Sequence, residues 1–382
     1  MKSRHAFEIR ILGMLIAGAL GGSVLAVPVF AQSYTAFDIG TLGGPGTYAA
    51  AINASGQITG NSDTANGGPN HAFVTLANGL GITDLGTLPG GNKSLGFGIN
   101  ASGQVTGESE FYNGGAISPR AFIADVNGGM RGVTQWSFSR GAGINDNGQV
   151  AGSISNISHS GTGAFVTGPG GVNATEIGSL HSSRDAATGI NTSGQVVGYA
   201  YLSASGLYEH AYITSANHTF ASDLGTLGGS RSYATSINDS GQVAGFSEIR
   251  TGFESPMHAF ITDIDSNMTD LGTLGGQNSR AFDINSNGQV VGWAETDIAN
   301  RRHAFITGPD GTGMTDLNSL IKLGNGIFLA DATGINDKGQ IIANASDGHA
   351  YLISPIPEPE TYAMFLAGLG LMSYIVRRRT AV

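Results

Sequence analysis

Cysteine is absent from the 382-residue chain. Its absence excludes disulfides, thiolate metal sites and cysteine nucleophiles together, so an exported chain of this kind must draw its stability from burial and closure. Helical periodicity of the apolar residues is missing between residues 33 and 354. No serine-centred elbow, zinc motif or phosphate loop occurs in a context that would support catalysis. Abundant glycine, 61 residues, beside frequent Phe, Tyr, Val and Ile favours short strands joined by tight turns.

Basic residues are scarce in the middle of the chain. The whole chain has 18 basic and 28 acidic residues. Six of these bases and three of these acids lie in the terminal segments, which leaves 12 bases and 25 acids between residues 32 and 354. The resulting charge near −13 argues against non-specific binding of nucleic acid.

Residues 1–31 have the pattern of a secretory signal peptide. An apolar stretch covers residues 11–25, and small residues at positions 29 and 31 predict cleavage after Ala31. The positive start consists of Lys2, Arg4 and Arg10. A retained membrane anchor is the alternative interpretation.

The last segment, residues 355–382, has three parts. An apolar stretch over residues 361–376 predicts a transmembrane helix of about 24 Å, slightly short of a hydrocarbon core. The basic residues after it favour a cytoplasmic end, with the rest of the chain outside. The parts that flank the stretch are Pro357, Glu358 and Pro359 before it and Arg377, Arg378 and Arg379 after it.

This three-part tail resembles the PEP-CTERM sorting signal of bacterial exported proteins. The resemblance implies recognition and cleavage by an exosortase, with transient anchoring in the inner membrane of a Gram-negative bacterium. It further implies a final location at the cell surface or outside the cell. A permanent tail anchor is the alternative.

One phrase occurs seven times: Ile-Asn, about two small polar residues, Gly-Gln, an aliphatic residue and usually Gly. Its copies are separated by 45 to 51 residues, a period typical of stacked or radially arranged supersecondary units. The copies begin at Ile52, Ile99, Ile144, Ile190, Ile237, Ile284 and Ile335.

Each repeat divides into four short runs, here called A, B, C and D. In the sixth copy they cover residues 280–285, 288–294 and 303–307, and the preceding D run covers residues 268–274. The body begins with a D run, residues 34–42, and ends with an A-B-C trio, residues 331–353. If the first D run completes the last trio, residues 32–354 form an all-β, seven-bladed β-propeller of four-stranded antiparallel blades. An open β-solenoid is the alternative, and it leaves the first D run unexplained.

Three features recur inside the repeats: one is typical of turns, and two predict packing. Asn-x-x-Gly between A and B is typical of a hairpin turn. An aromatic residue in C fills one equivalent position of each blade: Phe73, Phe122, Phe165, Tyr212, Phe260, Phe305 and Tyr351. A glycine in B permits close approach of a neighbouring backbone or ring, at Gly60, Gly107, Gly152, Gly198, Gly245 and Gly292.

Histidine and aspartate also recur. We expect each histidine at the start of C to donate to a carboxylate of D and so to fix its blade. A sevenfold metal or catalytic ring is the alternative, but equivalent positions of a propeller lie far apart unless they line the axis. The residues are His71, His210, His258, His303 and His349, with Asp38, Asp84, Asp223, Asp270 and Asp316.

The phrases His-Ala-Phe-Ile-Thr at residues 258–262 and Asp-Leu-Gly-Thr-Leu-Gly-Gly at residues 270–276 resemble the extracellular HAF repeat family. The resemblance covers residues 34–353 and implies an exported repeat protein without an assigned activity. The third unit departs from it, because Gly163 replaces the histidine and Trp136 stands in place of Asp-Leu-Gly.

Five basic residues lie four to six residues before an Ile-Asn phrase, where we expect D-to-A loops, and they predict a ligand-binding face. In a propeller the D-to-A and B-to-C loops share one face, and the B-to-C loops contribute aromatic residues. Cations with aromatics suit an acidic or neutral extracellular polysaccharide. The five are Lys93, Arg140, Arg184, Arg231 and Arg280.

We therefore expect an exported, non-catalytic binding or structural module with no cofactor and no metal. One alternative is a polysaccharide hydrolase or lyase that uses loop carboxylates, because such enzymes need two carboxylates about 5–10 Å apart. Glu108 with Glu110, or Glu295 with Asp297, could supply them. The other alternative is a purely structural matrix protein.

Overall fold

The structure is a computed structural model that describes residues 33–356, apart from 113–116, 127–128, 157–160, 178–179, 181–184, 203–207, 219, 251, 253–254 and 299–300. The chain separates into two units, residues 1–31 and residues 32–382, and all the described residues belong to the second. The predicted signal peptide with its cleavage site after Ala31, the residues at 357–359 and 377–379, and the helix predicted at 361–376 lie outside the described residues. In the part that is described, no helix has the length and apolar character needed to cross a membrane.

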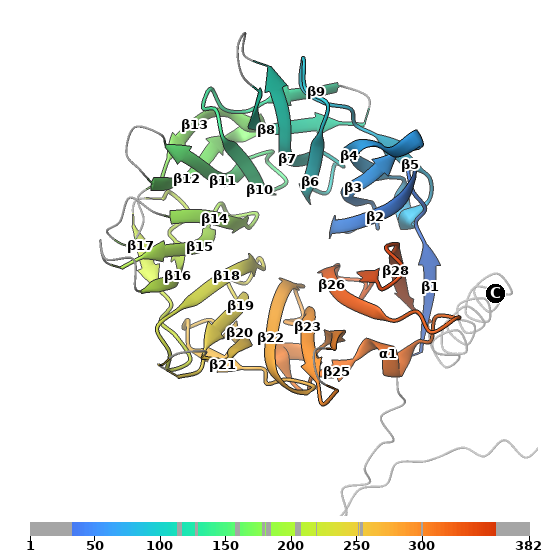
Figure 1. The fold of residues 1–382 in the computed structure, drawn as a ribbon. Coiled ribbons are helices and arrows are strands. Elements are labelled where there is room, and N and C mark those ends of the chain that lie inside the picture. Colours follow the sequence, from blue (N-terminus) through green and yellow to red (C-terminus); the bar gives the residue numbers. More distant parts are fainter. Residues whose placement is uncertain are drawn as a thin grey trace, which may run out of the picture. The chain divides into compact units, whose positions relative to one another are not determined.

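Seven four-stranded antiparallel sheets are arranged radially, as Figure 1 shows, so the predicted seven-bladed β-propeller is confirmed. The innermost strand of each sheet corresponds to run A: β2 (Gly43–Ile52), β6 (Ser94–Ile99), β10 (Ser139–Ile144), β14 (Asp185–Ile190), β18 (Ser232–Ile237), β22 (Gly275–Ile284) and β26 (Leu329–Ile335). The second strand corresponds to run B: β3 (Ile58–Thr64), β7 (Val105–Tyr112), β11 (Val150–Asn156), β15 (Val196–Tyr201), β19 (Val243–Glu248), β23 (Val290–Thr296) and β27 (Ile341–Ala345).

The outer half of each sheet consists of runs C and D. Run C gives β4 (Gly68–Thr75), β8 (Ile117–Asp125), β12 (Gly161–Gly168), β16 (Glu209–Thr214), β20 (Met257–Thr262), β24 (Arg302–Ile306) and β28 (Ala350–Pro355). Run D gives β5 (Ile82–Asp84), β9 (Gly129–Gly132), β13 (Val172–Glu176), β17 (Ala221–Asp223), β21 (Met268–Asp270), β25 (Thr315–Asp316) and β1 (Tyr34–Asp38). Short helices occupy connections: η1 (Ala65–Gly67), η2 (Ala77–Gly79), η3 (Pro169–Gly171), η4 (Pro309–Gly311) and α1 (Leu317–Leu320).

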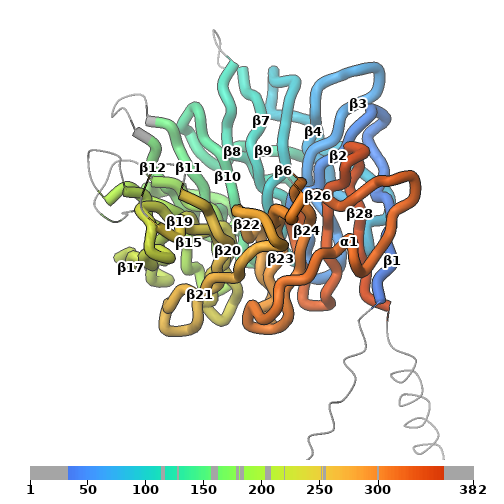
Figure 2. Tube along the Cα trace, turned by 60° about the horizontal axis from the view of Figure 1, so that its bottom comes forward, coloured from blue at the N-terminus to red at the C-terminus, as the bar shows by residue number. Residues whose placement is uncertain are grey.

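The first and last strands close the ring. The order of the closing sheet is β1-β28-β27-β26, and β1 pairs with β28 from Tyr34 opposite Pro355 to Asp38 opposite Tyr351. The two strands lie side by side in both views of the fold (Figures 1 and 2). The orphan D run at the start of the body therefore completes the last blade. It is shorter than expected, because the strand ends at Asp38 and Gly40, with φ of 81°, begins the turn that follows.

The predicted packing residues occupy the core. The aromatic residue of run C is fully buried in six blades, and Tyr351 of the closing blade is half-buried with its hydroxyl donating to Asp347 Oδ2 at 2.8 Å. A Cβ placed on any of the six recurrent B glycines would lie 1.9–2.1 Å from a carbonyl oxygen of the innermost strand. Such a separation is far below van der Waals contact, so a side chain at these positions would force the two inner strands apart.

A ring of hydrogen bonds joins the seven A-to-B turns. The asparagine of each Ile-Asn phrase is buried, and its Nδ2 donates to the backbone carbonyl of the corresponding asparagine in the next blade, at 2.9–3.3 Å. The Nδ2 also donates to the glutamine of its own turn, as Asn238 does to Gln242 Oε1 at 2.9 Å. The link from Asn336 to the Asn53 carbonyl crosses the joint between the last and first blades, so the ring is closed. We call these seven residues the asparagine ring: Asn53, Asn100, Asn145, Asn191, Asn238, Asn285 and Asn336.

Candidate functional site

Every innermost strand carries a bulge two residues before its Ile-Asn phrase. The strand register skips one residue there in each blade, and the skipped residue lines the central channel. The seven residues are Ala50, Phe97, Ala142, Thr188, Thr235, Phe282 and Thr333. Bulges re-aim side chains, and here they point one residue per blade toward the axis.

The three bulge threonines each tie their own blade to the next. Thr188 Oγ1 donates to the Ala234 carbonyl at 2.8 Å, and Thr333 Oγ1 donates to the Ala49 carbonyl at 2.8 Å. These hydroxyls are therefore occupied by the backbone. The channel wall at this level is structural, and it leaves the two bulge phenylalanines as its largest side chains.

One acidic residue lies in the channel wall. Asp283 Oδ1 accepts from Ser236 Oγ at 2.7 Å, and its Oδ2 accepts from the Ile335 N–H at 2.9 Å. Desolvation by burial raises the pKa of Asp283 to about 6, although both hydrogen bonds act to lower it. The carboxyl group thus bridges three consecutive blades.

The predicted histidine–aspartate pairs all form. Each histidine Nδ1 lies 2.7–2.9 Å from its aspartate: His71 with Asp84, His210 with Asp223, His258 with Asp270, His303 with Asp316, and His349 with Asp38. The last pair joins β28 to β1 across the closure. Each pair links the two outer strands of one blade, so the pairs do not converge on one site. The structural interpretation of these residues is confirmed.

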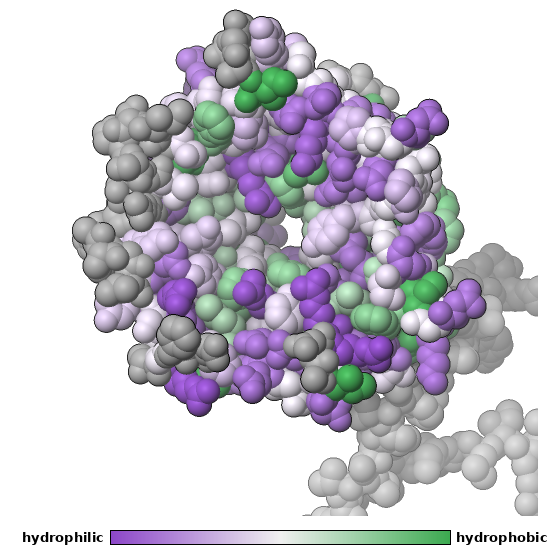
Figure 3. All heavy atoms as spheres, in the orientation of Figure 1, coloured by the Kyte–Doolittle hydropathy of each residue, from purple (hydrophilic) through white to green (hydrophobic). Residues whose placement is uncertain are grey.

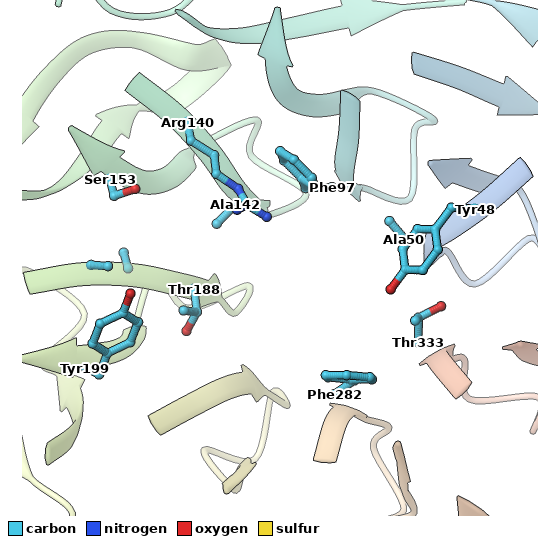
Figure 4. Close-up of a pocket in the computed structure, with 12 residues that line it drawn as sticks. Tyr48, Ala50, Phe97, Arg140, Ala142, Ser153, Thr188, Tyr199, Phe282 and Thr333 are labelled. Carbon is cyan, nitrogen blue, oxygen red and sulfur yellow. The ribbon is translucent and has the colours of Figure 1, made fainter. Parts of the chain in front are cut away.

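A wider cavity opens at the end of the channel opposite the asparagine ring, which we call the rim end. It has a volume of about 440 Å³ and is bordered by Tyr48, Phe97, Arg140, Tyr199 and Phe282. Figure 4 shows the guanidinium of Arg140 directed at Phe97, with Tyr48 and Phe282 facing the same space. Cavities of this size hold small organic ligands. In the space-filling view, hydrophilic and hydrophobic residues lie side by side around the central opening (Figure 3).

The structure places four of the five predicted basic residues, and Arg184 lies outside the described residues. Lys93 is exposed just before β6, and Arg231 is exposed just before β18. Arg140 and Arg280 lie within β10 and β22, so the expectation that all five occupy D-to-A loops is wrong for these two. These innermost strands extend further toward the rim end than the sequence pattern indicated.

The basic residues differ in what they contact. Arg231 Nε is paired with Glu248 Oε1 at 3.0 Å, and therefore holds its own blade together. The Arg140 guanidinium lies 3.7 Å from the centroid of the Phe97 ring. Arg280 lies 4.5 Å from the centroid of Phe246, and its buried Nε has no hydrogen-bond partner among the described residues. Arg140 and Arg280 are thus held by aromatic faces rather than by carboxylates.

A continuous run of four aromatic rings and one guanidinium group crosses three blades at the rim end. Tyr199 and Tyr233 have ring centroids 5.1 Å apart, and Tyr233 is stacked on Phe246 with centroids 5.0 Å apart. Arg280 extends the run from Phe246 to Trp293, whose ring centroid lies 5.7 Å from its Cζ. All five residues are half-buried. We call Tyr199, Tyr233, Phe246, Arg280 and Trp293 the aromatic arc.

The strand pairing explains why these residues gather. Tyr233 stands directly opposite Phe246, and Arg280 directly opposite Trp293, on the first two strands of their blades. In each blade these positions are four residues before the Ile of the phrase and one residue after the recurrent B glycine. Neither position repeats in type around the ring, so the repeat pattern gave no signal for them. Counting from the phrase and the glycine could have found them.

The acids considered for catalysis were expected in loops, but Glu108 and Glu110 lie within β7 and Glu295 lies within β23. Two of the four accept hydrogen bonds from the backbone. Glu295 Oε2 accepts from the N–H groups of Gln277 and Asn278, both at 3.1 Å. Glu110 Oε2 accepts from the Asn92 N–H at 3.3 Å. Glu110 therefore holds the connection before β6 in place, and Glu295 holds the first half of β22. Asp297 is exposed and Glu108 is half-buried.

Comparison with known families identifies the tail and part of the repeats. The PEP-CTERM protein-sorting motif matches residues 355–379, which confirms that resemblance and indicates an exported protein that an exosortase processes. A family described as "Protein of unknown function (DUF3466)" matches residues 201–350. The resemblance to HAF repeats stays a prediction. No curated protein matches the chain.

Solved structures share the fold. The structure described as YCF48 bound to D1 peptide has a TM-score of 0.51 and 12% identity, covering 86% of this chain and 99% of that one. Acylaminoacyl peptidase from Pyrococcus horikoshii has a TM-score of 0.51 and 10% identity, covering 83% of this chain and 53% of that one. TolB from Acinetobacter baumannii has a TM-score of 0.47 and 13% identity, and this chain spans 62% of its length. The two structures with a TM-score of 0.51 show a shared fold and nothing further about this chain.

Proposed function

We propose that this exported propeller is a non-catalytic module that binds extracellular polysaccharide at its rim end, at the cell surface or in the matrix. The observation that carries the proposal is the aromatic arc. It presents three aromatic residues and one guanidinium group without interruption from Tyr233 to Trp293. The cavity of about 440 Å³ opens at the same end and also includes Tyr199.

The chemistry of the arc suits a sugar chain. Sugar rings have apolar faces that pack on aromatic rings, and their hydroxyl groups need polar partners at the edges. Half-buried aromatic residues supply flat contact surfaces at a low cost in side-chain entropy, because their neighbours already hold them. The guanidinium of Arg280 adds donors that suit a hydroxyl, or the carboxylate of an acidic sugar.

Two of the acids considered for catalysis are not free to act on a substrate. General acid–base cleavage of a glycosidic bond needs two free carboxylates that face the same bond. Glu110 and Glu295 are engaged by backbone N–H groups of their own blades. Two of the four residues considered for catalysis are therefore occupied by backbone hydrogen bonds.

The test is glycan binding by the full chain, measured by isothermal titration calorimetry with neutral and acidic oligosaccharides. Phe246→Ala and Trp293→Ala each remove one surface of the arc. We expect each to weaken binding by about tenfold or more, the range for truncating an anchoring aromatic residue. Phe37→Ala is the matched control, because Phe37 is an exposed aromatic residue, 46% accessible, on the outermost strand β1.

Unchanged affinity in both arc variants would contradict the proposed site. Release of reducing ends by the wild-type chain would favour the hydrolase or lyase alternative. Thermal unfolding of each variant, followed by circular dichroism, separates a lost contact from a lost fold.

A further inference from the structure

A second cavity lies at the joint between the first and last blades. Its volume is about 390 Å³, and its border includes Tyr48, Asn61, Asp63, Arg302 and Asp331. Arg302 connects it to the aromatic arc, because the Arg302 Cζ lies 5.6 Å from the centroid of the Trp293 ring. The cavity therefore continues the arc toward the closing blade.

Asp331 is the first unusual group in this cavity. The residue is 7% accessible, and its Oδ2 accepts from Arg302 Nη2 at 3.1 Å. Its Oδ1 is buried and has no hydrogen-bond partner among the described residues. Burial raises the pKa of Asp331, while Arg302 acts to lower it. A buried carboxylate oxygen without a donor is costly, which points to a ligand that supplies one.

Asp63 is the second unusual group, and the repeat explains why. Asp63 stands three residues after the recurrent glycine of its second strand, and three other blades have an acid at that position. Each of these three acids accepts a hydrogen bond from a backbone N–H. The donor lies two residues before the recurrent Ser of the innermost strand. These contacts are Glu110 with Asn92, Glu248 with Ser230, and Glu295 with Gln277. In the first blade the corresponding donor position is Pro45, two residues before Thr47. Proline has no N–H, and the described residues provide the Asp63 carboxylate with no hydrogen bond.

The charges in this cavity select the ligand. Two carboxylates, Asp63 and Asp331, and one guanidinium, Arg302, border the cavity. The balance is one negative charge, and the unsatisfied atoms are acceptors. Asn344 is already engaged, because its Oδ1 accepts from the Ala49 N–H and its Nδ2 donates to the Ala49 carbonyl. The ligand must therefore provide hydrogen-bond donors, and a negatively charged ligand is repelled.

We infer that the cavity between the first and last blades is a subsite for one sugar residue rich in donors, a neutral or amino sugar, of a glycan that lies along the aromatic arc. This inference rests on the proposed function for the glycan itself. The hydroxyl or ammonium groups of the sugar donate to Asp331 Oδ1 and to the Asp63 carboxylate. Tyr48 offers a ring at the border of the cavity, with 42% of its surface exposed. A uronic acid residue is excluded from this position.

The experiment compares three probes on the full chain by isothermal titration calorimetry: a neutral glucose pentasaccharide, a fully de-N-acetylated glucosamine pentasaccharide and a galacturonic acid pentasaccharide. Asp63→Asn and Asp331→Asn are expected to weaken binding of the neutral and amino probes by about tenfold. Binding of the acidic probe should stay the same or strengthen, because a repelling charge is removed. Glu110→Gln is the matched control, since Glu110 is the corresponding acid of the second blade and is engaged by a loop N–H.

A second variant keeps the negative charge of the acid but gives its carboxylate a hydrogen-bond donor within the protein. Pro45→Asn combined with Asp63→Glu recreates the pair formed by Asn92 and Glu110 in the second blade. The loop N–H should then engage the carboxylate, and binding of the neutral and amino probes should fall as it does for Asp63→Asn. This variant serves as the test if a single substitution fails to fold.

Each outcome decides between the subsite and the arc. Unchanged affinity for all three probes in the Asp63 and Asp331 variants would overturn the subsite, and so would an equal loss for all three. If the arc variants lose binding in that case, the proposed function stands without the subsite. If the wild-type chain binds none of the probes, both proposals fail.

Discussion

The two ends of the central channel are built in opposite ways. At one end seven asparagines repeat the same hydrogen bond from blade to blade, and the Ile-Asn phrase is the same in every copy. At the rim end, equivalent positions carry different residues. Four residues before the Ile, for example, the seven blades have Tyr48, Leu95, Arg140, Ala186, Tyr233, Arg280 and Asp331.

The difference separates the parts that hold the ring from the parts available for recognition. The asparagine ring satisfies buried polar groups, and any change leaves its neighbours without partners. The rim positions contact one another across blades, yet their backbone pairing is made whatever the side chain. Of the two ends, the rim end is therefore the one that tolerates different side chains in different blades, and the aromatic arc lies there.

The largest effect on stability should come from opening the ring of blades, which disrupts the asparagine ring and the rim end together. Deletion of residues 33–38 takes away β1, the pairing partner of β28. It also removes Asp38, the partner of His349 at 2.8 Å. We expect loss of cooperative thermal unfolding, because the last sheet keeps an exposed edge. Differential scanning calorimetry checks this, and a transition as high and sharp as that of the full chain would contradict circular closure.

The next largest effect on stability should come from a change in the asparagine ring alone. Asn238→Ala removes the donors to the Gln242 side chain and to the Asn285 carbonyl, and the acceptor of the Gln242 N–H. Because these groups are buried and lose their partners, we expect a destabilisation of about 3 kcal/mol. Urea unfolding measures it.

The control for that variant lies at the rim. Asn61→Ala alters a half-buried asparagine of β3 opposite Tyr48 and should change the free energy of unfolding by less than about 0.5 kcal/mol. Equal effects of the two substitutions would remove the distinction between the ends.

The channel wall, which lies between the two ends, should make the stability of the protein depend on pH through Asp283. The folded-state pKa of Asp283 is raised to about 6, above the unfolded value of about 3.9. Between these values the folded chain binds more protons than the unfolded chain, so stability falls as pH rises from about 4 to 6 and then levels off. The expected loss is about 2–3 kcal/mol at most. Urea unfolding across this range should show the slope in the wild type and a smaller slope in Asp283→Asn, and identical slopes would refute the assignment.

The smallest effect on stability should come from the rim end. Arg280→Gln removes a cation that has no carboxylate partner among the described residues and rests on Phe246 and Trp293. We expect a destabilisation below about 1 kcal/mol, the value of a cation–π contact. Calorimetric binding should nevertheless weaken for glycans. A variant that lost stability but kept its affinity would show that the arc is a packing device.

The fold could be predicted from the sequence because its signals repeat. The phrase fixed the number of blades, and the orphan run at residues 34–42 indicated closure. The recurrent glycines of six blades and the histidine–aspartate pairs of five could be assigned from the sequence, since each has one physical reason wherever it occurs. The asparagine ring was missed, because its second partner belongs to the next blade about 47 residues away.

The candidate site could be predicted only in part. Arg140 and Arg280 were predicted as ligand-binding residues, in loops rather than in the strands where they lie, and the aromatic partners Phe246 and Trp293 were not predicted. These positions vary from blade to blade, and what brings them together is the contact between blades rather than spacing along the chain. Asp63 became visible only through the comparison of Pro45 with three equivalent loop residues.

The pairing of β1 with β28, which closes the ring, has a consequence for the order of folding. The Asp38 and His349 that it joins are 311 residues apart, and the Ile356 N–H donates to the Ser33 carbonyl at 2.8 Å. Pairing of such distant segments is slow, so we expect six blades to form before the seventh acquires its outer strand. A circular permutant that links residue 33 to residue 356 and opens the chain beside the exposed Ile264 would turn this late, long-range event into the formation of a local hairpin.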